Sequence, residues 1–386
     1  MQHPIATYNH NAHNTTAYQR YFEIKESKRA LHLCLNTAPM IDLNDVRLQK
    51  LSVHIVGNKG TGGELVTSRK PFTLSEHYSK TIATAFTAKM AQQQEWYKFT
   101  HLSSLDYNEV YNYCLQALAE DKDFHQQGVN IAKHLYEAST HPKIKAGELY
   151  ICHFDNCLIN GAYIPAIGIY KIETKTQFIN VDATTGELQL AMQEGTEVSK
   201  YDKAALIFAS NAPEGFDVLI QDTNRGEEAV FWRETFLGVA PQADEYHNTK
   251  EFLGLAKNFI TKQIPQEYDM ERTDQIDLLN KSVEYFQINQ SFDRKQFEKQ
   301  VLKDGGLIKS FRNFGESYAE SNDLELPDSF DISESAVKRQ QRVFKSVLKL
   351  DKNFHVYIHG DSSLIEKGYD SHVNKSYYKI YFDEEN

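Results

Sequence analysis

Three polar side chains in the middle of the chain match, by residue type, the active site of a metal-dependent nuclease. Asp155, Glu173 and Lys175 resemble an arrangement in which an aspartate and a Glu-x-Lys on neighbouring strands hold a divalent metal ion beside the phosphate to be cleaved. The alternating charges around Glu173 also fit a solvated strand that approaches a turn, and we favour this interpretation. A metal-dependent nuclease is therefore only the remote alternative function.

A second group, Cys152, His153 and Cys157, is the most metal-like cluster of the sequence. Structural zinc usually takes four ligands, and neighbouring residues on a strand point to opposite faces, so Cys152 and His153 do not readily share one ion. We interpret the two cysteines as buried small side chains and predict neither a metal site nor a cofactor. The sequence also lacks the Gly-x-Ser-x-Gly, His-Glu-x-x-His and kinase signatures, so we predict no catalytic residues and no enzyme.

The most distinctive chemical signal lies near the C-terminus, where residues 335–350 carry five basic side chains and no acidic one. These candidate DNA-binding residues are Lys338, Arg339, Arg342, Lys345 and Lys349. At about 100° per residue, all except Arg339 fall on one face of a helix, with apolar residues opposite. Such a row could neutralise DNA phosphates or contact an acidic protein surface, and the plain alternative is a solvated helix face. Ser333 or Ser335 is a suitable N-cap for this basic helix.

The elements that would position these residues follow from the spacing of apolar side chains. Segments rich in β-formers at 46–56 and 64–69 flank a glycine-rich turn and predict a hairpin, since the Lys-Ser/Thr of a phosphate loop is missing there. Helical spacing over 75–140 predicts a layer of helices. Six short segments with a period of two between residues 148 and 220 predict an antiparallel meander.

The second half of the chain returns to helical spacing from residue 223, and strand-like segments at 354–358 and 377–382 predict a closing hairpin. We therefore predict an α+β fold, with a helix layer on a mostly antiparallel sheet followed by a mainly helical region that ends in a β-hairpin. The expected units are a poorly ordered extension at 1–39, an α+β domain at 40–222, and a C-terminal region at 223–386 that contains the basic helix at 335–350.

Composition and charge narrow the classes of function. The 386 residues contain 42 Lys and Arg against 53 Asp and Glu, a formal net charge of −11 that disfavours indiscriminate binding to phosphate backbones. No apolar run approaches the roughly 18 residues of a membrane helix, and the short run at 30–35 does not make a signal peptide. Four scattered cysteines indicate a reducing compartment, and thus the cytoplasm. Periodic sequence begins after Met40, which we interpret as the natural start of the protein.

Short stretches along the chain resemble a known family. They read RLQKLSVHIV at 47–56, GELYICHF at 147–154, FINVD at 178–182, VFWRETFLG at 230–238, FRNFGE at 311–316, HVYI at 355–358 and YYKIYF at 377–382. Together these stretches resemble the bacterial 37 kDa nucleoid-associated protein family over residues 40–382.

The resemblance implies a cytoplasmic, non-enzymatic protein of the bacterial nucleoid, with links to double-stranded DNA and to type II topoisomerases. It assigns no individual DNA-binding residue, so the basic helix is our own assignment. We predict a nucleoid-associated protein that binds double-stranded DNA through this helix, without contact to a membrane. The alternative is an acidic adaptor that binds a type II topoisomerase or another chromosome protein and reaches DNA only through it. A homo-oligomer is compatible with either function.

Overall fold

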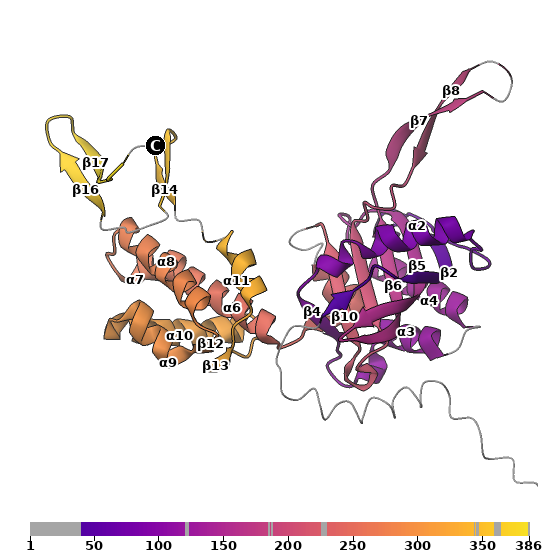
Figure 1. The fold of residues 1–386 in the computed structure, drawn as a ribbon, viewed down its shortest axis with the longest axis horizontal. Coiled ribbons are helices and arrows are strands. Elements are labelled where there is room, and N and C mark those ends of the chain that lie inside the picture. Colours follow the sequence, from indigo (N-terminus) through magenta and orange to yellow (C-terminus); the bar gives the residue numbers. More distant parts are fainter. Residues whose placement is uncertain are drawn as a thin grey trace, which may run out of the picture.

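A mostly antiparallel sheet is the framework of the first half of the chain (Figure 1). The computed structural model describes residues 40–386 except 120–122, 184–185, 187, 225–229, 343, 345–346, 359–363 and 385–386, so the predicted extension at 1–39 lies outside the described residues. In the described part, eight strands follow the order β11-β4-β10-β9-β6-β5-β2-β3, and β1 pairs with the end of β5. The strands are β1 (Ile41–Asp42), β2 (Arg47–Val56), β3 (Leu65–Thr67), β4 (Trp96–Phe99), β5 (Gly147–Ile159), β6 (Ala162–Ile172), β9 (Lys203–Phe208), β10 (Asp217–Asp222) and β11 (Val239–Pro241).

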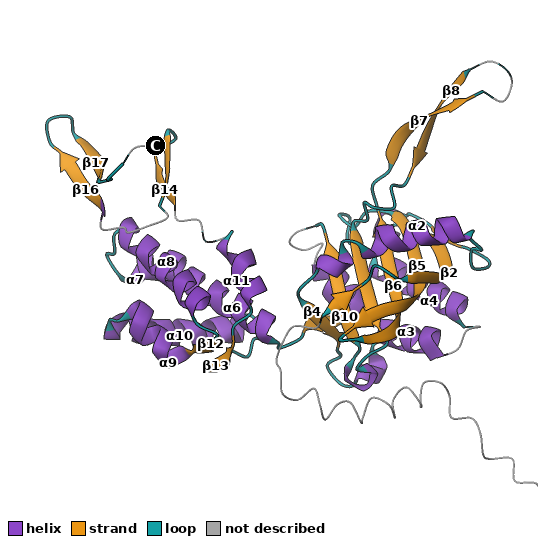
Figure 2. Cartoon of the chain, viewed as in Figure 1, coloured by secondary structure: helices purple, strands orange, loops and turns teal. Residues whose placement is uncertain are grey.

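Helices cover both faces of this sheet, as Figure 2 shows. The strand β9 lies between the two layers, because Ile207 belongs to one hydrophobic core and Leu206 belongs to the other. Every residue of β9 is buried, as expected for a strand that is covered on both faces. One core includes α3 (Glu109–Ala119), α4 (Phe124–Ala138) and the π-helical segment η5 (Phe231–Leu237), and the other includes α2 (Glu76–Thr87).

A second set of helices surrounds a core rich in phenylalanine. The centroid of the Phe252 ring lies 4.0 Å from that of Phe292 and 5.6 Å from that of Phe297. The elements are α6 (Glu245–Asn258), η6 (Phe259–Gln263), α7 (Ile264–Glu267), α8 (Arg272–Ile288), α9 (Arg294–Phe297), η7 (Glu298–Leu302), α10 (Gly305–Ser321) and α11 (Glu334–Gln341), with the strand pair β12 (Ser291–Asp293) and β13 (Ser329–Asp331). Ser333 caps α11 by accepting the backbone N–H of Ala336, which confirms one of the two predicted caps.

Among the described residues, three two-stranded hairpins lie outside the large sheet. One hairpin, β7 (Thr176–Asp182) with β8 (Gln189–Gly195), leaves the meander between β6 and β9 and stands away from the sheet (Figure 1). The other two are β14 (Val347–Leu350) with β15 (Phe354–Tyr357), and β16 (Ile365–Asp370) with β17 (Lys375–Ile380). The α+β fold class is confirmed, since the chain combines helices with a sheet whose strands pair antiparallel.

One predicted domain boundary and one predicted strand pairing differ from the structure. The first core extends beyond residue 222, because Trp232 is buried in it and β11 pairs with β4. The segments at 354–358 and 377–382 do not form one hairpin, because each pairs with its own short strand. Local apolar spacing locates a strand but does not choose its partner, which depends on packing of residues that are distant in the sequence.

The basic helix is shorter than predicted. The helix α11 ends at Gln341, and Val347–Leu350 form the strand β14. The short apolar run at 347–348 fits a helix face as well as a strand, and pairing with β15 decides in favour of the strand. The predicted row of four cations on one helix face is therefore wrong.

Candidate nucleic-acid interface

The structure separates the three residues of the nuclease pattern. Glu173 follows Ile172, which pairs with Glu148 at the start of β5, whereas Asp155 lies seven residues further along β5, opposite Arg47. At about 3.3 Å per residue this separation along the strand is roughly 23 Å. A single metal ion cannot bridge that distance, so the nuclease interpretation of Asp155, Glu173 and Lys175 is wrong.

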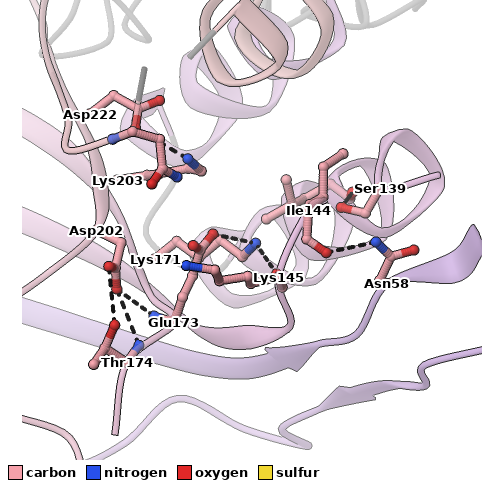
Figure 3. Close-up of polar contacts among 12 residues, drawn as sticks. Asn58, Ser139, Ile144, Lys145, Lys171, Glu173, Thr174, Asp202, Lys203 and Asp222 are labelled. Atoms are coloured by element: carbon pink, nitrogen blue, oxygen red, sulfur yellow. Dashed lines mark hydrogen bonds and ion pairs between the residues drawn. The ribbon is translucent and has the colours of Figure 1, made fainter. Parts of the chain in front are cut away.

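Glu173 instead belongs to a buried ion pair at the end of the sheet (Figure 3). The Nζ of Lys171 lies 2.9 Å from the Glu173 carboxylate and donates a second hydrogen bond of 2.6 Å to the carbonyl of Lys145. The two side chains are only 0% and 1% exposed. Burial lowers the pKa of Lys171, although the Glu173 carboxylate acts in the opposite direction. The group therefore holds the ends of strands together rather than facing a substrate.

The cysteine cluster is buried as interpreted from the sequence. Cys152 and Cys157 are both inaccessible, and burial raises the pKa of both thiols, that of Cys157 to about 12. Thiols with a raised pKa stay protonated at neutral pH and are poor metal ligands. Within the part of the chain that the structure describes, no three His, Cys, Asp or Glu side chains are grouped so that they could hold a metal ion.

The predicted basic residues do not act as one row. Lys338 is exposed on α11 and forms an ion pair with Glu334 one turn earlier, with 3.5 Å between Nζ and the carboxylate. Arg339, also exposed, donates a hydrogen bond to the Tyr246 hydroxyl. Arg342 is exposed at the C-terminal end of α11. Lys349 projects from β14, and Lys345 lies outside the described residues.

Lys349 lies in a groove between the two C-terminal hairpins and the start of α8. The pairing of β14 with β15 places Lys349 directly opposite His355, and Arg272 is the first residue of α8. The groove has a volume of about 670 Å³, and its polar lining comes from Arg272, Lys349, His355, Tyr357 and Tyr378. We name these five residues the hairpin groove. Two permanent cations, a titratable imidazole and two phenol hydroxyls are groups that bind phosphate oxygens.

A small apolar cluster holds the walls of the hairpin groove together. Leu348 of β14 and Ile276 of α8 are buried against each other, and Tyr378 of β17 packs on the same cluster. Alternation along β14 then directs Lys349 away from this cluster. Sequence reasoning singled out Lys349 but missed Arg272 and His355, because neither belongs to a basic run.

Comparison with known families identifies the relatives of the chain. A family model described as nucleoid-associated protein YejK matches residues 52–382. The chain belongs to this family.

The match to the nucleoid-associated protein family confirms the resemblance seen in the sequence. It spans the sheet from Ser52 in β2 to the residues just after β17, and so includes the hairpin groove. A search of curated proteins found no match to the chain. In the residues that the structure describes, no helix is both long and apolar enough to cross a bilayer.

Sequence reasoning also missed a buried serine and histidine group in this nucleoid-associated protein. Ser68 donates its backbone N–H to Nδ1 of His54, so neutral His54 carries its proton on Nε2, which lies 3.0 Å from the Ser52 hydroxyl. That hydroxyl lies 2.8 Å from Nδ1 of His125, whose Nε2 donates to the carbonyl of Ser68. The bond from Ser68 requires a neutral His54, because a protonated Nδ1 has no lone pair to accept it. Since Ser52 is completely buried, the ring is structural.

We expect this ring to make the protein less stable in weak acid. Burial and the neighbouring His125 lower the pKa of His54 to about 4, below the value of 6.5 for an exposed imidazole. The unfolded chain then binds the proton first, so the free energy of unfolding should decrease as the pH falls from 6.5 to 4, by up to about 3 kcal/mol. Urea unfolding followed by tryptophan fluorescence between pH 7.5 and 4 measures this slope. His54→Gln should flatten it, and an unchanged slope in that variant would contradict the assignment.

Proposed function

We propose that this nucleoid-associated protein binds double-stranded DNA directly, without catalysis, and that the hairpin groove is the principal contact. The observation that carries the proposal is the convergence of Arg272, Lys349 and His355 from three separate elements of a protein whose net charge is −11. A local cluster of cations attracts phosphates, while the acidic remainder limits indiscriminate coating of DNA. The proposed place of action is the nucleoid in the bacterial cytoplasm.

The shape of the C-terminal hairpins suits a duplex. A two-stranded β-ribbon fits the major groove of B-DNA, and the hairpins β14–β15 and β16–β17 flank the hairpin groove. Arg272 and Lys349 would contact phosphates, and the hydroxyls of Tyr357 and Tyr378 would donate hydrogen bonds to the backbone. These contacts fix position without reading bases, so we propose binding without strong sequence preference.

The remaining predicted residues belong to or follow α11. Arg342, exposed at the end of α11, would add a phosphate contact, and Lys345, which lies outside the described residues, remains a candidate contact from the sequence alone. Lys338 would contribute less than Arg339, because the ammonium of Lys338 is paired with the Glu334 carboxylate. An exposed cation that already has a partner gains less from binding a phosphate.

The net charge of −11 favours a second candidate function. An acidic protein could act as an adaptor that binds a type II topoisomerase or another chromosome protein and reaches DNA only through it. In that case the purified protein would have no affinity of its own for a duplex. Direct binding measurements separate the two candidates.

We expect the affinity for a duplex to depend steeply on salt. If about three phosphates are contacted, the affinity should fall about 40-fold between about 50 and 200 mM salt, because each contact releases a counterion. Fluorescence anisotropy with a labelled duplex measures this slope, with an unrelated acidic protein of similar isoelectric point as the control. Absence of binding at the lowest salt would contradict direct contact and favour the adaptor.

A further inference from the structure

The hairpin β7–β8, which we name the β-arm, is exposed along nearly all of its two strands. It leaves the chain after β6 and returns before β9, and it projects beyond the edge of the large sheet (Figure 1). Every residue of β7 is exposed, as is every residue of β8 except Gly195. An isolated two-stranded hairpin is only marginally stable in water, so an element of this kind needs a contact that the single chain does not supply.

One face of the β-arm is aliphatic. The cross-strand pairs Ile179 with Met192 and Val181 with Leu190 lie on this face, and the four side chains are between 57% and 76% exposed. Leu188, just before β8, continues the same alternation and is also exposed. The opposite face is mostly polar, and its residues are Phe178, Asn180, Asp182, Gln189, Ala191 and Gln193. This alternation is the pattern of a sheet with one face buried, and a contiguous exposed apolar patch marks an interaction site.

The charge of the β-arm selects the kind of partner. Residues 176–199 contain four acidic residues and no Lys or Arg. A segment of this composition is repelled by nucleic acid and by anionic membranes, so the partner is another protein surface. This inference does not depend on the proposed function, since the β-arm lies in a different part of the fold from the hairpin groove.

The aliphatic face is complementary to itself. No charged residue lies among the pairs Ile179–Met192 and Val181–Leu190, so two copies of this face can meet about a two-fold axis without opposing like charges at the centre. Two faces of five aliphatic side chains would bury on the order of 1,000 Å² in total, which reaches the lower end of specific protein interfaces. Every other copy of the chain carries the same aliphatic face, so this partner is always present at the concentration of the protein itself. We propose that the β-arm is a dimerisation element whose aliphatic face packs against the same face of a second copy.

The mass of the full chain in solution tests this proposal. Analytical ultracentrifugation at about 1–100 µM should show a species with twice the chain mass of 44.4 kDa. The variant V181K/L190K places two lysines opposite each other on the aliphatic face and should raise the dimer dissociation constant by about 100-fold or more, since like charges then meet in the interface. The matched control N180K/A191K places the same lysine pair on the other face and should remain a dimer.

A mixing experiment distinguishes arm-to-arm contact from docking of the β-arm elsewhere on the second copy. V181K/L190K mixed with V181E/L190E should restore a species of twice the chain mass, because opposite charges then meet across the interface. Circular dichroism of each variant should match the original protein, since the substituted side chains are exposed in the single chain. A monomeric original protein at about 100 µM, a dimeric V181K/L190K, or failure of the mixture to associate would each overturn the proposal.

Discussion

Replacement of both Arg272 and Lys349 by glutamate is expected to weaken duplex binding about 30-fold or more at low salt, and to reduce the slope of log affinity against log salt by about two. Each substitution removes one proposed phosphate contact and adds a charge that repels the backbone. Fluorescence anisotropy across a salt series measures both quantities. The effect is expected to be large because these are the two permanent cations of the hairpin groove.

The double variant should retain the fold. Arg272 is the first residue of α8, where a glutamate interacts favourably with the helix dipole, and Lys349 is exposed on β14. The control variant K70E/K133E changes the net charge by the same amount at two exposed positions outside the hairpin groove. If both double variants lost affinity equally, the loss would reflect net charge, and the hairpin groove would not be the site.

The strand β9 in the middle of the sheet was predictable because it is fully buried. The apolar run in β9 has no polar face, so only a strand covered by two layers accommodates it. The strand β4 was missed, because Trp96–Phe99 is only four residues long and lies within a stretch of helical spacing. Its place in the sheet depends on pairing with β10 and β11, which lie more than a hundred residues later.

The candidate site was predictable only in part, for a related reason. Lys349 belongs to a basic run that is visible in the sequence, whereas Arg272 has acidic residues close by and His355 is an isolated imidazole. The strand register brings His355 opposite Lys349, and packing of Leu348 against Ile276 brings α8 close to both. Local sequence contains neither contact. The density of basic residues in the sequence therefore identified the region around Lys349. The residues that join Lys349 in the hairpin groove are determined by the fold.

Replacement of Glu173 by alanine is expected to lower the free energy of unfolding by about 3–5 kcal/mol, because it leaves the buried ammonium of Lys171 without its carboxylate. Urea unfolding at pH 7 measures the loss. The matched control Glu137→Ala breaks the exposed ion pair with Lys59 and should cost less than about 1 kcal/mol. The contrast between the two variants tests whether burial determines the importance of the pair.

The pH dependence of the Glu173→Ala variant provides an independent check. Burial already lowers the pKa of Lys171, and removal of the carboxylate should lower it further. The unfolded chain then holds the lysine proton up to about pH 10.4 while the folded protein releases it earlier, so the stability of the variant should increase as the pH rises towards that value. The double variant K171M/E173L removes both charges and should be more stable than Glu173→Ala at pH 7. If Glu173→Ala were as stable as the original protein, Glu173 would not be the essential partner of Lys171, and the end of the sheet would have to be held by the neighbouring pair of Lys203 and Asp222.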